Sequence, residues 1–237
     1  MIGFVVPVAP MVWADEEEVV GEETPKKPLA FIDIGNSKEG SYPGGSTPVE
    51  GKWWVDANAS ILKIETEPLV EGWFEFGPEI REKGATIQAA GMAPGEGKIR
   101  SRMGVGLFGP NGFQLRLVFA RNEIELVRRG RVLGVVSFDL EPKESYRMEL
   151  SILEDEGNWM ITGRVWADET DRPLSFIISY KAFKAELLFP LAGRAVLIAT
   201  PFSGEPVGFL EASVFDGEIV MKDDEDDSES GAPAAIE

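Results

Sequence analysis

The chain has 237 residues, of which 43% are hydrophobic, so it can bury a core and form one sizeable domain or two small ones. It carries 41 acidic and 23 basic residues, a net charge of −18, and contains neither His nor Cys. These absences exclude Ser-His-Asp and Cys-His nucleophiles, metal sites built on imidazole or thiolate, and disulfides. Carboxylate, Lys, Tyr or Ser/Lys chemistry, oxygen-ligated Ca²⁺ or Mg²⁺, and binding without catalysis stay open.

The first 14 residues, MIGFVVPVAPMVWA, are apolar and end in the small residues Val12-x-Ala14 that a signal peptidase reads. The stretch is too short to span a bilayer, which takes about 20 apolar residues. We therefore expect residues 1–14 to be a signal peptide, truncated at its basic end, and the protein to be secreted, periplasmic or on the cell surface. An apolar N-terminus of a cytosolic protein is the alternative, and no other segment is long and apolar enough for a transmembrane span.

Two acidic segments flank the remaining chain. Residues 15–28 carry a net charge of −4 and predict a linker, and residues 222–237 carry −6 and predict a disordered tail, which leaves −8 for the rest. We expect both to be solvated, although the run Asp223–Asp227 could also bind a cation or a basic partner. Nucleic acid is not an expected partner, because phosphate contacts need clustered Lys and Arg. The densest basic stretch, Arg128-Arg129-Gly130-Arg131, has the pattern of a hairpin turn.

Between the two acidic segments, short apolar runs separated by Gly, Pro, Asn or Asp predict strands. We expect a single all-β domain over residues 29–221, an antiparallel two-sheet sandwich of the jelly-roll kind. Only Tyr180–Leu188 has a helical pattern, which allows at most one short helix near 180–188. The expected strands are Leu29–Ile34, Lys52–Val55, Ser60–Glu65, Trp73–Phe76, Ala85–Ala90, Ile99–Leu107, Phe113–Phe119, Glu123–Val127, Val132–Phe138, Tyr146–Leu153, Trp159–Trp166, Leu174–Ser179, Ala195–Ala199 and Gly208–Phe215.

Two hairpins stand out in this series. Phe113–Phe119 and Glu123–Val127 form one, and Tyr146–Leu153 and Trp159–Trp166 form the other. In the first hairpin, alternation puts Leu115 and Leu117 toward the core together with Ile124 and Leu126. Gln114, Arg116 and Glu125 then share the other face, where Arg116 and Glu125 could form a cross-strand pair.

A sugar-binding surface needs an exposed aromatic face beside planar polar groups. Trp166 shares one strand face with Arg164, and Gln114 shares another with Arg116 and Glu125. We take these five residues as the candidate ligand-binding patch, provided that the strand order brings the two faces together. The alternative is that the tryptophans belong to the core or pack at a sheet edge.

Asp168, Glu169 and Asp171 follow Trp166 in a predicted loop. Carboxylates at a sheet end could bind Ca²⁺ or a sugar hydroxyl, but these three match no metal-binding motif, and a solvated turn beside Arg172 is the favoured interpretation. We expect no other cofactor.

Six segments between residues 50 and 220 share a characteristic pattern of strands and turns. They are Trp53–Asp56, Arg102–Phe113, Tyr146–Leu150, Gly163–Trp166 with Arg172 and Pro173, Phe202–Phe209 and Ala212–Phe215. This pattern resembles the concanavalin A-like lectin/glucanase superfamily, the laminin-G-like jelly rolls, and more narrowly the bacterial secreted 3-keto-disaccharide hydrolase-like domains. The resemblance covers residues 50–220 and implies a fold more than an activity, since members bind sugars, cleave glycosides or serve as modules of cell-surface proteins.

Glycoside hydrolysis usually needs two carboxylates on either side of the scissile bond. The superfamily's glucanases carry them in a Glu-x-Asp-x-x-Glu run, which this sequence lacks. Glu123 and Glu125 have the required alternation, but neighbouring arginines would keep both ionised. We therefore expect no catalytic residues and favour a non-catalytic module that binds a carbohydrate or a cell-surface protein. A glycoside hydrolase of the 3-keto-disaccharide hydrolase-like type and a structural subunit that binds a partner protein are the alternatives.

Overall fold

The structure is a computed structural model that describes residues 27–34, 36–65, 70–81, 84–93, 101–184, 187, 190–201 and 206–217. The predicted signal peptide, residues 15–26 of the acidic linker and the acidic tail lie outside the described residues, as does most of the loop 202–206. The described residues fall within one compact unit, Lys26–Ile219.

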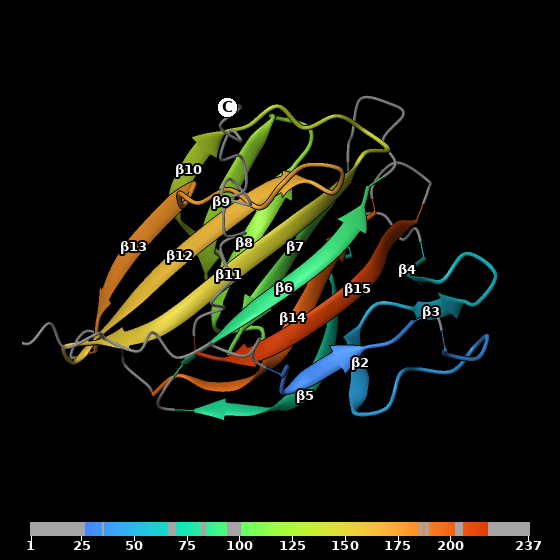
Figure 1. The fold of residues 1–237 in the computed structure, drawn as a ribbon, viewed down its shortest axis with the longest axis horizontal. Coiled ribbons are helices and arrows are strands. Elements are labelled where there is room, and N and C mark those ends of the chain that lie inside the picture. Colours follow the sequence, from blue (N-terminus) through green and yellow to red (C-terminus); the bar gives the residue numbers. More distant parts are fainter. Residues whose placement is uncertain are drawn as a thin grey trace, which may run out of the picture. The chain divides into compact units, whose positions relative to one another are not determined.

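Two antiparallel sheets of eight and seven strands build the fold, as the sequence predicted. Figure 1 shows them as two layers, with β13, β12, β11, β6 and β15 side by side in the layer nearer the viewer. That layer, sheet A, has the order β13 (Ile178–Phe183), β12 (Asn158–Ala167), β11 (Ser145–Asp155), β6 (Gly84–Met92), β15 (Val207–Asp216), β4 (Ile61–Ile64) and β3 (Trp53–Asp56), with β1 (Ala30–Ile32) beside β15.

Sheet B forms the second layer. It has the order β10 (Arg131–Ser137), β9 (Glu123–Arg128), β8 (Phe113–Val118), β7 (Arg102–Leu107), β14 (Ala192–Thr200), β5 (Gly72–Arg81) and β2 (Ser46–Glu50). Strand β13 is one edge of sheet A, and β10 is one edge of sheet B.

The core lies between the sheets and consists of the inward-facing side chains of each strand. On β8 and β9 the inward residues are Leu115, Leu117, Ile124 and Leu126, all fully buried, as alternation predicted. Each such side chain contributes about 1.5–3 kcal/mol on burial. The alternating apolar pattern of the sequence is thus the main stabilising feature of the sandwich.

Both predicted hairpins form. In the first, Arg116 lies directly opposite Glu125, and in the second, β11 and β12 pair along their whole length. The basic stretch is also a hairpin turn, because Arg128 ends β9 and Arg131 begins β10 opposite it. Arg129 and Gly130 between them have φ of 49° and 74°, the positive values that a type I′ turn requires.

The prediction of a short helix near 180–188 is wrong for residues 180–183. Tyr180–Phe183 belong to β13, an extended edge strand that pairs with β12 through Ser179↔Thr162 and Lys181↔Met160. The backbone hydrogen bonds offered by β12 outweigh a weak local helical pattern. In the second half only Lys184 and Leu187 are among the described residues.

The described chain begins and ends on neighbouring strands. Strand β1 pairs antiparallel with β15 through Ala30↔Val214, and the Leu29 amide donates to the Val214 carbonyl at 2.7 Å. The three residues of β1 pair only with Ala212–Val214, so β1 extends sheet A only beside the last part of β15.

Among the described residues, no helix has the length and apolar character needed to cross a membrane.

Gly84 at the start of β6 provides a test of the sheet geometry. Its φ is +81°, and an added Cβ would lie 1.9 Å from the Ile152 carbonyl oxygen on β11. Gly157, in the β11–β12 turn, has a similar φ of +79° with open space around it. Gly157→Ala should therefore cost only the backbone penalty of about 1–2 kcal/mol, whereas Gly84→Ala should cost at least about 1 kcal/mol more because β11 must move.

Urea denaturation of the wild type and both variants measures this difference. Equal destabilisation would contradict the close approach of β6 and β11 at Gly84.

Candidate functional site

The five predicted ligand-binding residues lie on two opposite faces of the sandwich. On β12, Ile161 and Val165 point into the core, so Arg164 and Trp166 project from the outer face of sheet A. Gln114, Arg116 and Glu125 project from the outer face of sheet B. The predicted five-residue patch therefore does not form, because the core separates its two halves.

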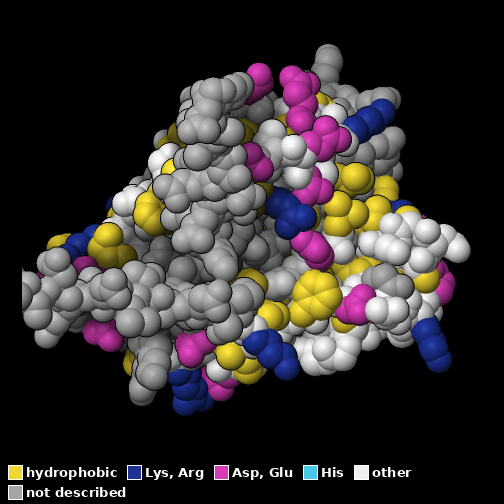
Figure 2. Space-filling model, in the orientation of Figure 1, with side chains coloured by type: hydrophobic (Ala, Val, Ile, Leu, Met, Phe, Trp, Pro, Cys, Tyr) yellow, Lys and Arg dark blue, Asp and Glu magenta, His cyan; other side chains and the backbone are white. Residues whose placement is uncertain are grey.

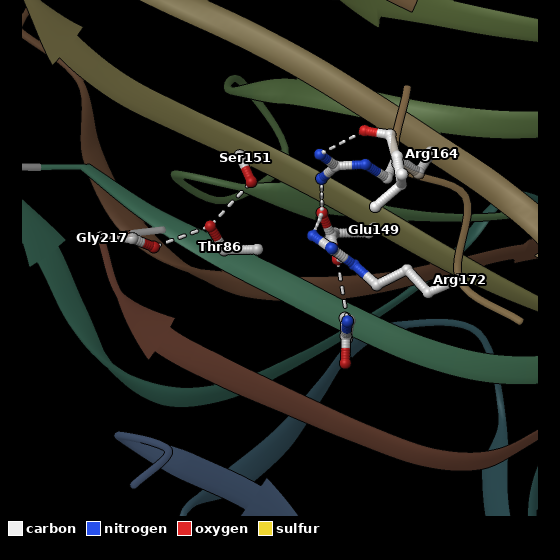
Figure 3. Close-up of polar contacts among 8 residues, drawn as sticks. Thr86, Glu149, Ser151, Arg164, Arg172 and Gly217 are labelled. Carbon is white, nitrogen blue, oxygen red and sulfur yellow. Dashed lines mark hydrogen bonds and ion pairs between the residues drawn. The ribbon is translucent and has the colours of Figure 1, made fainter. Parts of the chain in front are cut away.

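Arg164 belongs to a buried ionic cluster centred on Glu149 of β11 (Figure 3). Glu149 is 1% exposed and accepts hydrogen bonds from Arg164, from Arg172 at 2.7 and 2.8 Å, and from Gln88 at 2.8 Å. Burial alone would raise the pKa of Glu149, but the hydrogen bonds from Arg172 and Gln88 and the two guanidinium charges lower it below its ordinary value. Glu149 is therefore held ionised, which is unsuitable for a general acid.

The cluster fixes the chain that follows β12. Arg164 also donates to the Leu174 carbonyl at 3.2 Å, and its guanidinium lies 4.0 Å from the centre of the Phe176 ring. Arg172 comes from the same connection. These contacts hold the connection between β12 and β13 against the outer face of sheet A.

A second group of polar contacts lies beside the cluster on the same face. The Thr86 hydroxyl donates to the Gly217 carbonyl at 2.7 Å and shares a 2.8 Å hydrogen bond with the Ser151 hydroxyl (Figure 3). These bonds attach the chain after β15 to β6 and β11. They contribute to the stability of the fold.

Trp166 is 7% exposed and borders a small depression with Arg147 and Glu211. Its volume is about 20 Å³, enough for a water molecule and too small for a sugar ring. Arg147 pairs with Asp168 at 2.5 Å and with Glu211 at 2.7 Å. Basic and acidic side chains lie next to one another near the centre of the face in Figure 2.

The weak metal candidates Asp168, Glu169 and Asp171 do not come together. Asp168 faces Arg147 and accepts a 3.4 Å hydrogen bond from Ser145. In the ranges that the structure describes, no group of three or more Asp or Glu residues is placed to hold a metal ion.

On sheet B the predicted side chains bond to near neighbours. Arg116 pairs with Glu71 at 2.9 Å and donates to Gln114 at 2.9 Å, and its guanidinium lies 6.0 Å from the Trp73 ring centre. Arg116 and Glu125 lie opposite each other on neighbouring strands, but Glu125 forms its ion pair with Arg121. The hydrogen-bonding capacity of this face is largely used within the protein.

A more open site lies where the edges of the two sheets meet. We call it the edge cleft, a cavity of about 290 Å³ between the β9–β10 hairpin of sheet B and β13 of sheet A. Its volume is close to the lower end for small-molecule sites. Its lining residues are Phe113, Arg128, Arg129, Arg131, Leu133, Tyr180, Ala182, Phe183 and Leu187.

The edge cleft combines aromatic walls with planar donors. Phe183 is 49% exposed, and the rings of Phe113 and Tyr180 are 6.4 Å apart. The Arg128 guanidinium lies 5.1 Å from the Phe113 ring centre. Two features of the sequence mark this cleft, the basic hairpin turn at 128–131 and the aromatic residues of 180–183. No short stretch of the sequence predicted that these two segments lie close together.

A larger cavity of about 610 Å³ lies beside the edge cleft and shares Leu187 with it. Trp159 forms part of its wall, and Lys184 lies 4.9 Å from that ring and 3.0 Å from Glu154. In this larger cavity, the charge of Lys184 is neutralised by Glu154, which lines the same cavity. The edge cleft has no Asp or Glu among its described lining residues.

No protein-family model and no curated protein matches the sequence. Solved structures do match the fold. The carbohydrate-binding module CBM66 from Bacillus subtilis superposes with a TM-score of 0.52 at 12% identity, over 72% of this chain and 95% of its own. The metal-free carbohydrate recognition domain of Emp46p gives 0.58 at 11% identity, over 83% and 100%. The galactose-complexed lectin UEA-II gives 0.51 at 7% identity, over 81% and 100%.

The fold is a concanavalin A-like sandwich. Identities of 7–12% support this statement about the fold alone. The broad resemblance stated from the sequence is confirmed, and the narrower one to 3-keto-disaccharide hydrolase-like domains stays a prediction.

The Glu149 cluster predicts a large effect of a small substitution. Glu149→Gln leaves Arg164 and Arg172 without their carboxylate, so unfolding free energy should fall by about 3–5 kcal/mol. The exposed turn residue Glu156 provides the control, since Glu156→Gln should change it by less than about 0.5 kcal/mol. Chemical denaturation at pH 7 measures both, and similar values for the two variants would contradict a structural role of the cluster.

The same cluster predicts a pH dependence. Because the pKa of Glu149 lies below its ordinary value of 4.5 in the folded state, its ionisation stabilises the fold above that pH. This contribution is lost as the pH falls through the folded-state pKa. The wild type should therefore lose its stability advantage over Glu149→Gln progressively as the pH is lowered below about 5, measured by urea midpoints along a descending pH series. A constant difference between the two proteins would refute the assignment.

Proposed function

We propose that the protein is a secreted, non-catalytic carbohydrate-binding module and that its edge cleft holds a sugar ring. One observation carries the proposal: an exposed aromatic side chain and planar guanidinium donors share one cavity of about 290 Å³. A sugar presents an apolar C–H face and a rim of hydroxyl groups. Phe183 and Tyr180 offer the packing surface for the first, and Arg128 and Arg131 offer donors for the second.

The fold supports the same proposal. CBM66 is a carbohydrate-binding module and the Emp46p domain is a carbohydrate recognition domain, and both share the sandwich. The exoplasmic/lumenal domain of VIP36, solved in a Ca²⁺/Man2-bound form, also shares the sandwich, with a TM-score of 0.51 at 11% identity.

Binding without hydrolysis agrees with the residues of the cleft. A glycosidase of the usual kind needs a carboxylic acid and a carboxylate around the bond that it cleaves. None of the described residues that line the edge cleft is Asp or Glu. In the adjoining cavity Glu154 pairs with Lys184, whose hydrogen bond lowers the pKa of Glu154 rather than raising it as a general acid would need. For these reasons we do not propose a 3-keto-disaccharide hydrolase-like activity.

Secretion is part of the proposal and rests on the apolar segment Met1–Ala14, which lies outside the described residues. Because the signal is expected to be truncated at its basic end, the test adds a short basic segment before Met1. Expression in a secreting host should then yield a mature protein that begins at Asp15, as measured by mass spectrometry of the N-terminus. Full-length chain retained in the cytosol would remove this part of the proposal.

Phe183 and Phe31 form a matched pair for testing the site. They are 49% and 51% exposed, but only Phe183 lines the edge cleft. A glycan array should show binding by the wild type and by Phe31→Ala. Phe183→Ala should lose about tenfold or more in affinity, since aromatic stacking and burial contribute about 1–2 kcal/mol.

The control arm is Trp166→Phe on the outer face of sheet A. Loss of binding in this variant alone would move the site to the face predicted from the sequence. A wild type that binds no glycan would refute the carbohydrate-binding proposal in favour of a protein partner.

A further inference from the structure

The edge cleft has a local charge opposite to that of the protein. The chain carries a net −18, yet three arginines from four consecutive positions, Arg128, Arg129 and Arg131, line this one cavity. Among the described residues, neither Arg128 nor Arg131 forms an ion pair with a carboxylate. By contrast, the guanidinium groups of Arg164 on β12 and of Arg172 in the connection after it share Glu149.

Arg128 is the least satisfied of the three. Its Nε is buried and has no hydrogen-bond partner in the described part of the chain. Burial and then the charge of Arg129 lower the pKa of Arg128 from its ordinary value, although a guanidinium stays protonated at neutral pH. A buried donor without an acceptor costs free energy, and so do two like charges in neighbouring positions. An anion in the cleft would offset the repulsion between the two guanidinium charges.

The shape of the cleft restricts the kind of anion. A guanidinium can bind a planar carboxylate or a sulfate through two parallel hydrogen bonds, and Arg128 and Arg131 both line the cleft. The remaining wall is aromatic, with Tyr180 and the half-exposed Phe183. A free inorganic anion would leave this apolar wall unused, whereas a ring that carries the anion would cover it.

We propose that the edge cleft selects acidic saccharides, with a uronate carboxylate or a sugar sulfate bound by Arg128 and Arg131 and the ring packed on Phe183 and Tyr180. The inference rests on the proposed carbohydrate-binding function and specifies its ligand class. Arg129, exposed at the turn, adds to the positive potential at the mouth of the cleft.

The test uses the full chain and a panel of uronate-containing and sulfated oligosaccharides, each paired with a neutral derivative. The derivative has the carboxylate reduced to an alcohol or the sulfate removed. Calorimetric titration should give affinities for the acidic forms at least about tenfold higher than for the neutral forms, and the difference should shrink with added salt.

Three variants locate the effect. Arg128→Met and Arg131→Gln should each weaken binding of the acidic form about tenfold or more and leave binding of the neutral form nearly unchanged. Lys52→Gln removes one positive charge from the exposed β2–β3 turn, where Lys52 pairs with Glu65 at 3.4 Å, and should bind like the wild type. This control separates a local contact from a change in net charge.

Thermal unfolding without ligand distinguishes lost binding from lost structure. Arg128→Met keeps the aliphatic stem against Phe113 and removes an unpaired charge, so its melting temperature should equal or exceed that of the wild type. A lowered melting temperature would mean that Arg128 is a structural residue, and Arg131→Gln alone would then decide the anion contact.

The outcomes separate the two proposals. If acidic and neutral forms bind equally, or if both arginine variants bind acidic forms like the wild type, the acidic selectivity is refuted while carbohydrate binding stands. If no oligosaccharide of either kind binds, the proposed function itself is refuted.

Discussion

All the described strands except the edge strands β2 and β10 bury side chains in the core between the sheets, and the other features of the molecule follow from that requirement. The buried rows form a core that is continuous between the sheets. The remaining rows face outward, where polar side chains bond to one another, as Glu149 does with Arg164 and Arg116 does with Glu71. Among the described residues, most polar side chains of the broad faces therefore bond within the protein, and the edge cleft lies where the two sheets end.

The domain contains two groups of arginines whose roles differ because their neighbouring side chains differ. Around Glu149, two guanidinium groups converge on one carboxylate that is almost inaccessible to water, so that each charge has a partner and the connection after β12 is held in place. In the edge cleft, arginines approach one another and an aromatic ring instead. Each arrangement has one buried Nε without a partner, on Arg164 and on Arg128, but only in the second do arginines that form no ion pair among the described residues line an accessible cavity.

The sequence predicted local features well and their assembly less well. Alternation correctly placed Leu115 with Ile124, because side-chain direction in a strand depends only on parity. Parity cannot say which sheet a strand joins, so Arg164 and Arg116 were grouped although they lie on opposite faces. The edge cleft needs β10 and β13, which are over 40 positions apart, to lie close together, and Tyr180–Phe183 was assigned to a helix that β12 does not allow. Strand order is set by the combined burial of all strands, which no short segment encodes.

The pairing of β1 with β15 has an architectural consequence. Ala30 lies opposite Val214, so the polypeptide enters and leaves the sandwich on adjacent strands of one sheet. A domain with this arrangement can be placed inside a loop of another protein, because the host chain needs to separate by only a short distance to accommodate it. For the same reason a short linker could join residues 27 and 217 and new termini could be opened at an exposed hairpin such as Glu156–Gly157, which makes the fold suitable for circular permutation.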